Sequence, residues 1–123
     1  MIYADYNYYK HSYLGDQIKA EGFGQLAKRS SEYIDYVTMG RAQLHAEENK
    51  IRDACCALAE QFHIIDLAAK AAADGGVVES ETVGPHSVHY ASPSDAAKVA
   101  QKELYQVAQR YLWPYMYRGV AYV

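Results

Sequence analysis

The sequence predicts a mainly α-helical protein, a small helical bundle with a long central helix and one projecting β-hairpin or extended loop. Two stretches with apolar residues every three or four positions predict long helices, at about 47–73 and 93–113. Between them, residues 76–91 are rich in valine and are broken by Gly84-Pro85, which is typical of two short strands around a turn. With 123 residues, the chain predicts a single domain, residues 1–123, with a modest core.

Two further helices are expected before the central one. Asp5 is a candidate cap for a short tyrosine-rich helix over about 5–14. A second, amphipathic helix is predicted over about 20–37, although Gly22 and Gly24 weaken its first turn by about 1 kcal/mol each. The chain has 13 Tyr but 2 Phe and 1 Trp, and tyrosine suits contact surfaces better than dry cores. Because tyrosines gather near both ends, we expect both ends to dock, either on this subunit or on a neighbour.

The central helix carries the clearest pattern, because its apolar residues step by four and three along one face. The main positions of this stripe are Ile51, Cys55, Leu58, Phe62, Ile65 and Ala69. Ile64 and Leu67 are expected to widen it, whereas Asp53, Glu60 and Lys70 are expected to lie away from it. The adjacent Cys55 and Cys56 diverge on a helix, so we expect them to pack rather than to form a disulfide.

The last helix has a compact start signal in Ser92-Pro93-Ser94-Asp95, where a serine cap precedes a proline at the first helical position. Pro114 disfavours helix at the residue before it and therefore ends the element nearby. The apolar positions of this helix are Ala97, Ala100, Leu104, Val107 and Tyr111. Their spacing predicts that the helix packs antiparallel to the central one.

The predicted hairpin is poor in apolar surface. Ordering some fifteen residues costs roughly 1–2 kcal/mol each in backbone entropy. Its four valines and one tyrosine return about 1.5–3 kcal/mol apiece if they are fully buried. An isolated two-stranded ribbon is also marginal in water. Two interpretations follow: a mobile surface loop, or a ribbon that another subunit or partner completes.

No group of residues forms a convincing catalytic or metal site. His86 and His89 would point to opposite faces of a strand, which disfavours metal binding. For His63 and Asp66, three apart on a helix, a surface hydrogen bond is expected rather than catalysis. We therefore predict that the protein is not an enzyme and uses no cofactor. A small enzyme that uses His63 or the adjacent cysteines is the rival interpretation.

Charge and hydropathy narrow the classes of partner. The net charge is −3 and no basic stripe is present, which disfavours direct binding to DNA phosphates. No apolar run approaches eighteen residues, so no membrane span or signal peptide is predicted. Two adjacent cysteines fit a reducing cytoplasm.

Three segments together resemble the small head–tail connector proteins, also called adaptor or head-completion proteins, of long-tailed phages and prophages. The first is YADYNYYKHSYLGDQI followed by AKRSSEYIDYVTMGR, the second is IRDACCALAEQ, and the third is GGVVESETVGPHSVHYA. The third is the most specific, and together they span most of residues 3–91. The C-terminal helix and tail are similar to those proteins in type but not in sequence.

The resemblance implies a structural virion protein, made in the bacterial host cytoplasm, that forms a dodecameric ring below the portal at the head–tail junction. The implied partners are other copies of the chain, the portal protein and a tail-completion or stopper protein, with DNA only as passing cargo and no membrane. Free subunits of such assemblies can be monomers. The mildly acidic balance fits a channel through which DNA slides, provided that acidic residues face the lumen.

The same resemblance assigns interface roles to individual residues. The interface with other copies or partners would include Val78, Ser80, Glu81, Val83, Gly84, Ser87, Val88 and Tyr90. A looser transfer gives a portal-facing role to Leu112, Trp113, Tyr115, Tyr117 and Arg118. The alternative function is a small DNA-packaging or regulatory protein similar to a terminase small subunit, which would act by binding DNA.

Overall fold

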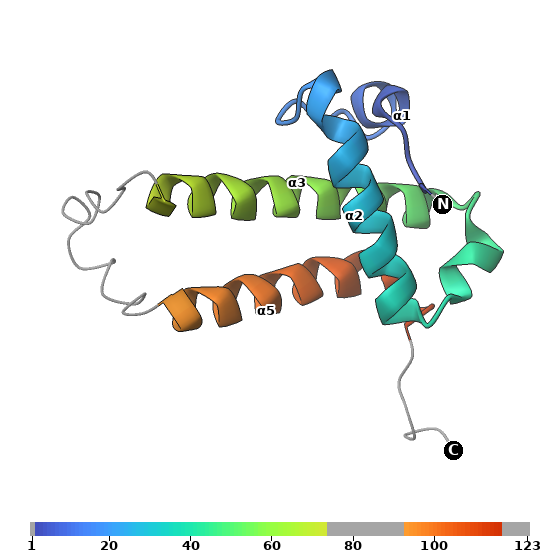
Figure 1. The fold of residues 1–123 in the computed structure, drawn as a ribbon. Helices are drawn as coiled ribbons and strands as arrows, with labels where there is room; N and C mark the ends of the chain where they lie inside the picture. Colours follow the sequence, from blue (N-terminus) through green and yellow to red (C-terminus); the bar gives the residue numbers. More distant parts are fainter. Residues whose placement is uncertain (1, 74–92, 117–123) are drawn as a thin grey trace, which may run out of the picture.

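The computed structural model describes residues 2–73 and 93–116 and confirms a mainly helical fold (Figure 1). The elements are α1 (Tyr6–His11), α2 (Ala20–Thr38), the 3-10 helix η1 (Arg41–His45), α3 (Asn49–Ala73) and α5 (Pro93–Leu112). The predicted hairpin at 76–91 lies outside the described residues, and the residues that are described contain no strand. No helix in the described ranges is long and apolar enough to cross a membrane.

Local sequence sets the ends of the first two helices. Asp5 caps α1, because its carboxylate accepts a hydrogen bond from the Tyr8 amide at 2.8 Å. This confirms the predicted cap, although α1 ends at His11, earlier than expected. α2 ends at Met39, which adopts the left-handed backbone conformation with φ 53°, and Gly40 follows with φ 79°. This turn satisfies the last carbonyls of α2 and starts η1.

The core lies where α2 crosses α3 and where α5 runs antiparallel beside α3 (Figure 1). Its largest fully buried apolar and aromatic side chains are Tyr9, Phe23, Ile34, Ile51, Leu58, Leu104 and Leu112. Small residues meet at the crossing of α2 and α3, since Cys55 Sγ lies 3.7 Å from the Ala27 carbonyl oxygen and 3.5 Å from Ser31 Oγ. Cys55 and Cys56 are free and buried, which confirms that they pack.

The buried stripe of α3 is narrower at its far end than the sequence predicts. Ile64 and Leu67 are 48% and 54% exposed, so the expected widening of the stripe is wrong. Nearer the start of the helix the burial is broader than predicted and includes Ala54, Cys56, Ala57 and Ala59. The reason is that the start of α3 lies among α1, α2 and α5, whereas its far half runs beside α5 (Figure 1).

The buried stripe of α5 also differs from the expected one. Its fully or nearly fully buried residues are Leu104, Ala108 and Leu112, which are four residues apart. Val107 and Tyr111 are only partly buried, because this four-residue step turns the core face of the helix away from them. α3 and α5 extend past α2 as a pair, so the end of α3 and the start of α5 lie at the same end of the molecule (Figure 1).

Candidate functional site

Most of the residues predicted to form an interface lie outside the described part of the chain. They are Val78, Ser80, Glu81, Val83, Gly84, Ser87, Val88, Tyr90, Tyr117 and Arg118. His86 and His89 also lie outside it. The structure describes the other three members of the predicted portal-facing set. Leu112 is fully buried and offers no surface in the free subunit, whereas Trp113 is 58% exposed.

Tyr115, the third of these residues, is held against the start of α3. Its hydroxyl donates to a Glu48 carboxylate oxygen, and its ring lies 4.8 Å from the His45 ring, centroid to centroid. His45 Nδ1 lies 2.9 Å from the other Glu48 oxygen. The hydrogen bonds from Tyr115 and then from His45 lower the pKa of Glu48. Residues 113–116, which follow α5, are therefore held beside η1, and they include the exposed Trp113.

The tyrosine-rich opening docks on its own subunit through what we call the tyrosine–carboxylate cluster. This cluster comprises Tyr3, Tyr8, Tyr9 and Tyr13 with Asp35, Asp53 and Glu60. The Tyr3 hydroxyl donates to Asp35 on α2, whereas the others donate to carboxylates on α3. The Tyr8–Asp53 and Tyr9–Glu60 hydrogen bonds are both 2.8 Å long. Hydrogen bonds to ionised carboxylates are among the stronger ones in proteins, so they bind this segment firmly to α2 and α3.

Tyr9 is the centre of the cluster. Its ring is completely buried and stacks on Phe23 with a centroid distance of 4.9 Å. Its hydroxyl donates to Glu60 and accepts hydrogen bonds from the backbone amides of Gln17 and Ile18, at 2.9 and 3.1 Å. A Cβ placed on Gly15 would collide with the Tyr9 ring, so this side chain, rather than a positive φ, requires glycine at position 15.

Buried hydroxyls on α2 determine where the flanking segments dock. Ser31 Oγ bonds back to the Ala27 carbonyl at 2.8 Å and accepts the Tyr3 amide at 3.0 Å. Thr38 Oγ1 likewise donates a hydrogen bond to the Ile34 carbonyl, at 2.7 Å, and accepts one from the Ala42 amide, at 3.3 Å. Each hydroxyl therefore satisfies a polar group of an adjoining segment inside an otherwise apolar core.

The environment keeps the tyrosines of the cluster protonated. Burial, followed by the hydrogen bond to Asp53, raises the pKa of Tyr8 to about 12. Burial and the Glu60 carboxylate raise the pKa of Tyr9 to about 12, although the Gln17 and Ile18 amides oppose part of this rise. Burial also raises the pKa of Tyr3 and Tyr13. All four tyrosines therefore act as hydrogen-bond donors at neutral pH.

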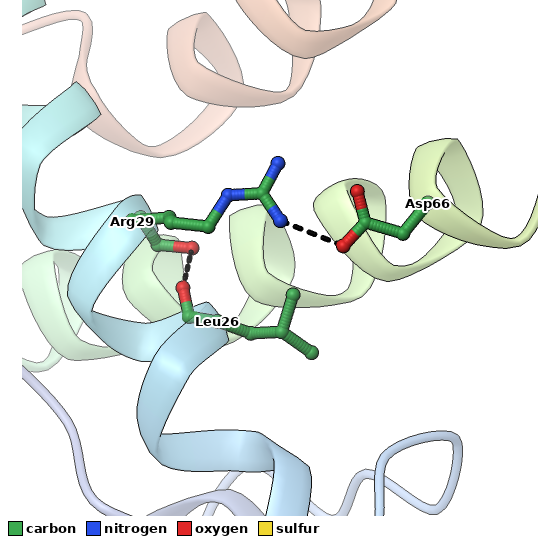
Figure 2. Close-up of polar contacts among 4 residues, drawn as sticks. Leu26, Arg29 and Asp66 are labelled. Carbon is green, nitrogen blue, oxygen red and sulfur yellow. Dashed lines mark hydrogen bonds and ion pairs between the residues drawn. The ribbon is translucent and has the colours of Figure 1, made fainter. Parts of the chain in front are cut away.

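Beyond the core, a single arginine connects α2 to the far half of α3. Figure 2 shows Arg29 reaching across to Asp66, with Nη1 and Oδ2 2.6 Å apart. The same guanidinium lies 4.5 Å from the centre of the Phe62 ring. Asp66 is thus bound to Arg29, and the predicted hydrogen bond between His63 and Asp66 is wrong, because the stronger cationic partner on α2 reaches the carboxylate.

A shallow groove of about 550 Å³ lies between the tyrosine-rich opening and α3. It is lined by Ile2, Tyr3, Ala4, Asp5, Asn7, Tyr8, Ser12 and Arg52. Several of its polar groups are used within the fold, since Asp5 caps α1 and Tyr8 binds Asp53. Arg52 lies over the Tyr8 ring, 5.7 Å from its centre.

The remaining candidate groups are the two cysteines and clusters of metal-binding side chains. Burial raises the pKa of both Cys55 and Cys56, so both thiols stay protonated in the folded chain. Within the ranges that the structure describes, no three His, Cys, Asp or Glu side chains come together as a metal site.

Sequence reasoning predicted docked tyrosines but not their carboxylate partners. The available signals were the four-residue step from Tyr9 to Tyr13 and the seven-residue separation of Asp53 and Glu60. Comparison of the chain with models of protein families, with curated proteins and with solved structures finds no match.

Proposed function

We propose that the protein is a head–tail connector, a structural virion protein that forms a ring between the portal and the tail of a long-tailed phage or prophage. In this role it offers a docking surface for the tail and continues the DNA channel. Its partners are other copies of itself, the portal protein and a tail-completion or stopper protein. DNA passes through the ring without specific binding.

One observation carries this proposal beyond the resemblance in sequence. The antiparallel α3 and α5 extend past α2, and the two points from which residues 74–92 depart lie together at the far end of this pair (Figure 1). These residues include the predicted interface positions. Their attachment points are away from the core that α1 and α2 help to build, which is a suitable place for a segment that is completed by a neighbour.

The firmly docked opening of the chain supports the same role. Ring subunits need a rigid body on which variable contacts are mounted, and the tyrosine–carboxylate cluster supplies such a body at the start of α3. The net charge of −3 is also compatible with a channel through which DNA slides without sticking.

The proposal is tested by introducing charge at Val83 and Val88. We expect Val83→Asp/Val88→Asp to stay folded but to lose ring formation on the portal protein of the same virus, as seen by electron microscopy. The control is Gln25→Asp/Gln106→Asp, which adds the same charge at exposed helical positions and should form rings normally. Normal rings from the valine variant would contradict the proposal. DNA binding that weakens steeply with added salt would instead indicate the terminase-like alternative.

A further inference from the structure

Positive charge is concentrated near the end of the chain. Residues 1–96 carry eight Lys and Arg against fourteen Asp and Glu, whereas residues 97–123 carry four Lys and Arg against one Glu. The net charge of −3 therefore conceals a basic portion that begins within α5. Such an asymmetry along a chain is typical of proteins that meet a polyanion.

α5 places its basic residues on one exposed face. Lys98, Lys102 and Arg110 are all exposed, and the exposed Gln106 completes their four-residue steps. We call these three cations the basic row. It covers twelve positions, which is roughly 18 Å along the helix axis. The row lies on the side of α5 away from α3, because the buried stripe centred on Ala108 faces α3 (Figure 1).

No carboxylate neutralises the basic row within the described part of the chain. None of its three cations forms an ion pair there, whereas Arg29 on α2 is paired with Asp66. Glu103 is the one acidic residue in the part of α5 that follows its first turn. Because Glu103 comes directly after Lys102, its side chain points about 100° away from that lysine around the helix. The cations of the row are therefore available to an external anion.

The face that carries the row is open and convex. Among the described elements, α5 packs along α3 and meets α2 only near its own end (Figure 1). Lys, Arg and Gln side chains reach phosphate oxygens without needing a fixed pocket, and such contacts carry no sequence information. This face therefore suits contact with a nucleic-acid backbone and not the recognition of bases.

Building on the DNA channel proposed above, we propose that the basic row of α5 faces the DNA and makes transient contacts with its phosphates. Duplex DNA carries one negative charge per ~1.7 Å of its axis, so a row of roughly 18 Å lies opposite on the order of ten phosphates. A duplex is negative along this whole length, whereas an acidic protein surface would have to match three separated positions. The acidic remainder of the subunit keeps the contact weak, so that DNA is guided and not held.

Nuclear magnetic resonance of the full-length, 15N-labelled protein tests this contact without requiring tight binding. A short DNA duplex is titrated into the protein at low salt. We expect the amide signals between Lys98 and Arg110 to shift, and to shift alike for duplexes of unrelated sequence. The logarithm of the binding constant should fall with the logarithm of the salt concentration with a slope of about −2.7, because each of three phosphate contacts contributes about −0.9.

Matched variants test whether the row itself makes the contact. Lys98→Gln/Lys102→Gln should weaken binding at least about tenfold at low salt and reduce the slope to about −0.9. Lys19→Gln/Lys70→Gln is the control, because it changes the net charge equally at exposed sites outside α5. It should bind within about twofold of the unmodified protein. Equal losses in the two variants, or no shifts in α5 at low salt, would overturn the proposal.

Three further outcomes separate this contact from other roles. A slope far steeper than −2.7, with shifts spread beyond α5, would indicate a larger DNA-binding surface and the terminase-like alternative. Loss of rings on the portal in Lys98→Gln/Lys102→Gln, with the DNA shifts unchanged, would show that the row binds an acidic protein surface instead. Rings of the unmodified protein without α5 shifts would leave the connector function standing and remove only the DNA contact, whereas α5 shifts without rings would do the reverse.

Discussion

One face of α3 is covered by other parts of the subunit along its first half and is exposed along its second half. Asp53, Cys56 and Glu60 follow one another at steps of three and four, and Ile64 and Leu67 continue the same steps. The first half of this face is covered by the tyrosine-rich opening, with Cys56 fully buried. The second half leaves two large aliphatic side chains about half exposed.

The comparison shows that the subunit does not cover this face according to hydrophobicity alone. Acidic residues are the attachment points, because a tyrosine buries a large ring and satisfies a carboxylate with the same side chain. The aliphatic residues, which gain the most from burial, are left available to a partner. On this one helix, acidic residues therefore bind the subunit's own opening segment, whereas aliphatic residues stay exposed.

Replacement of Tyr9 should disrupt the covered half most strongly. Tyr9→Ala removes a fully buried ring and the centre of three hydrogen bonds, so we expect a loss of about 3–5 kcal/mol in the free energy of unfolding. Tyr9→Phe keeps the ring but leaves buried polar groups without a partner, which should cost about 1–3 kcal/mol. Urea unfolding followed by circular dichroism measures both. Equal losses in the two variants would show that the hydroxyl, not the ring, is what matters.

A smaller loss is expected from Gly15→Ala, because the new methyl group collides with the buried Tyr9 ring. Overpacking of this kind costs about 1–3 kcal/mol. Gly24→Ala on α2 is the matched control, since a Cβ there meets nothing within 4 Å and the helix should gain about 0.5–1 kcal/mol. The same unfolding assay applies. A neutral Gly15→Ala would mean that the Tyr9 ring is free to move.

High pH should weaken the covered half selectively. Tyr8 and Tyr9 have a pKa of about 12 in the fold, above their ordinary value of 10.0. Their contribution is therefore complete below pH 10 and is lost as the pH rises from about 10 through about 12, because the unfolded chain loses its phenol protons first. We expect the free energy of unfolding to fall over this window, and less steeply in Tyr9→Phe. Parallel pH curves for the two proteins would contradict the role of Tyr9.

Polar substitution of the uncovered half should affect stability least. Ile64→Gln and Leu67→Gln alter half-exposed side chains, so each should change the free energy of unfolding by no more than about 0.5 kcal/mol. Leu58→Ala, on the fully buried stripe of the same helix, should cost about 2–5 kcal/mol by comparison. A large loss from Leu67→Gln would indicate that the subunit itself covers this residue.

Much of the helical framework could be predicted from the sequence. Periodic apolar spacing, the cap at Asp5 and the proline at the first position of α5 placed the helices within a few residues, because these signals are local. Apolar spacing failed to predict burial at positions where burial depends on how far a neighbouring element extends. Ile64 and Leu67 satisfy a helical stripe, but their burial depends on whether another element extends that far, which spacing along one helix does not encode.

The polar interior could not be predicted in the same way. Tyr9 and Glu60 are 51 residues apart and Tyr3 and Asp35 are 32 apart, so their pairing is a product of the tertiary fold. Ser30, Ser31 and Thr38 were not expected in the core because hydroxyl residues are usually exposed. Their bonds to the carbonyls four residues earlier remove the cost of burial.

The docking of the tyrosine-rich opening has a consequence for synthesis. The ribosome adds about 5–20 residues per second, so Glu60 is joined to the chain about 2–8 s after Ile18. During that interval the opening segment has been made while the surface that will hold it has not. Tyr8, Tyr9 and Tyr13 must therefore stay unattached until the first half of α3 emerges, so the part of the chain that is translated first cannot close first.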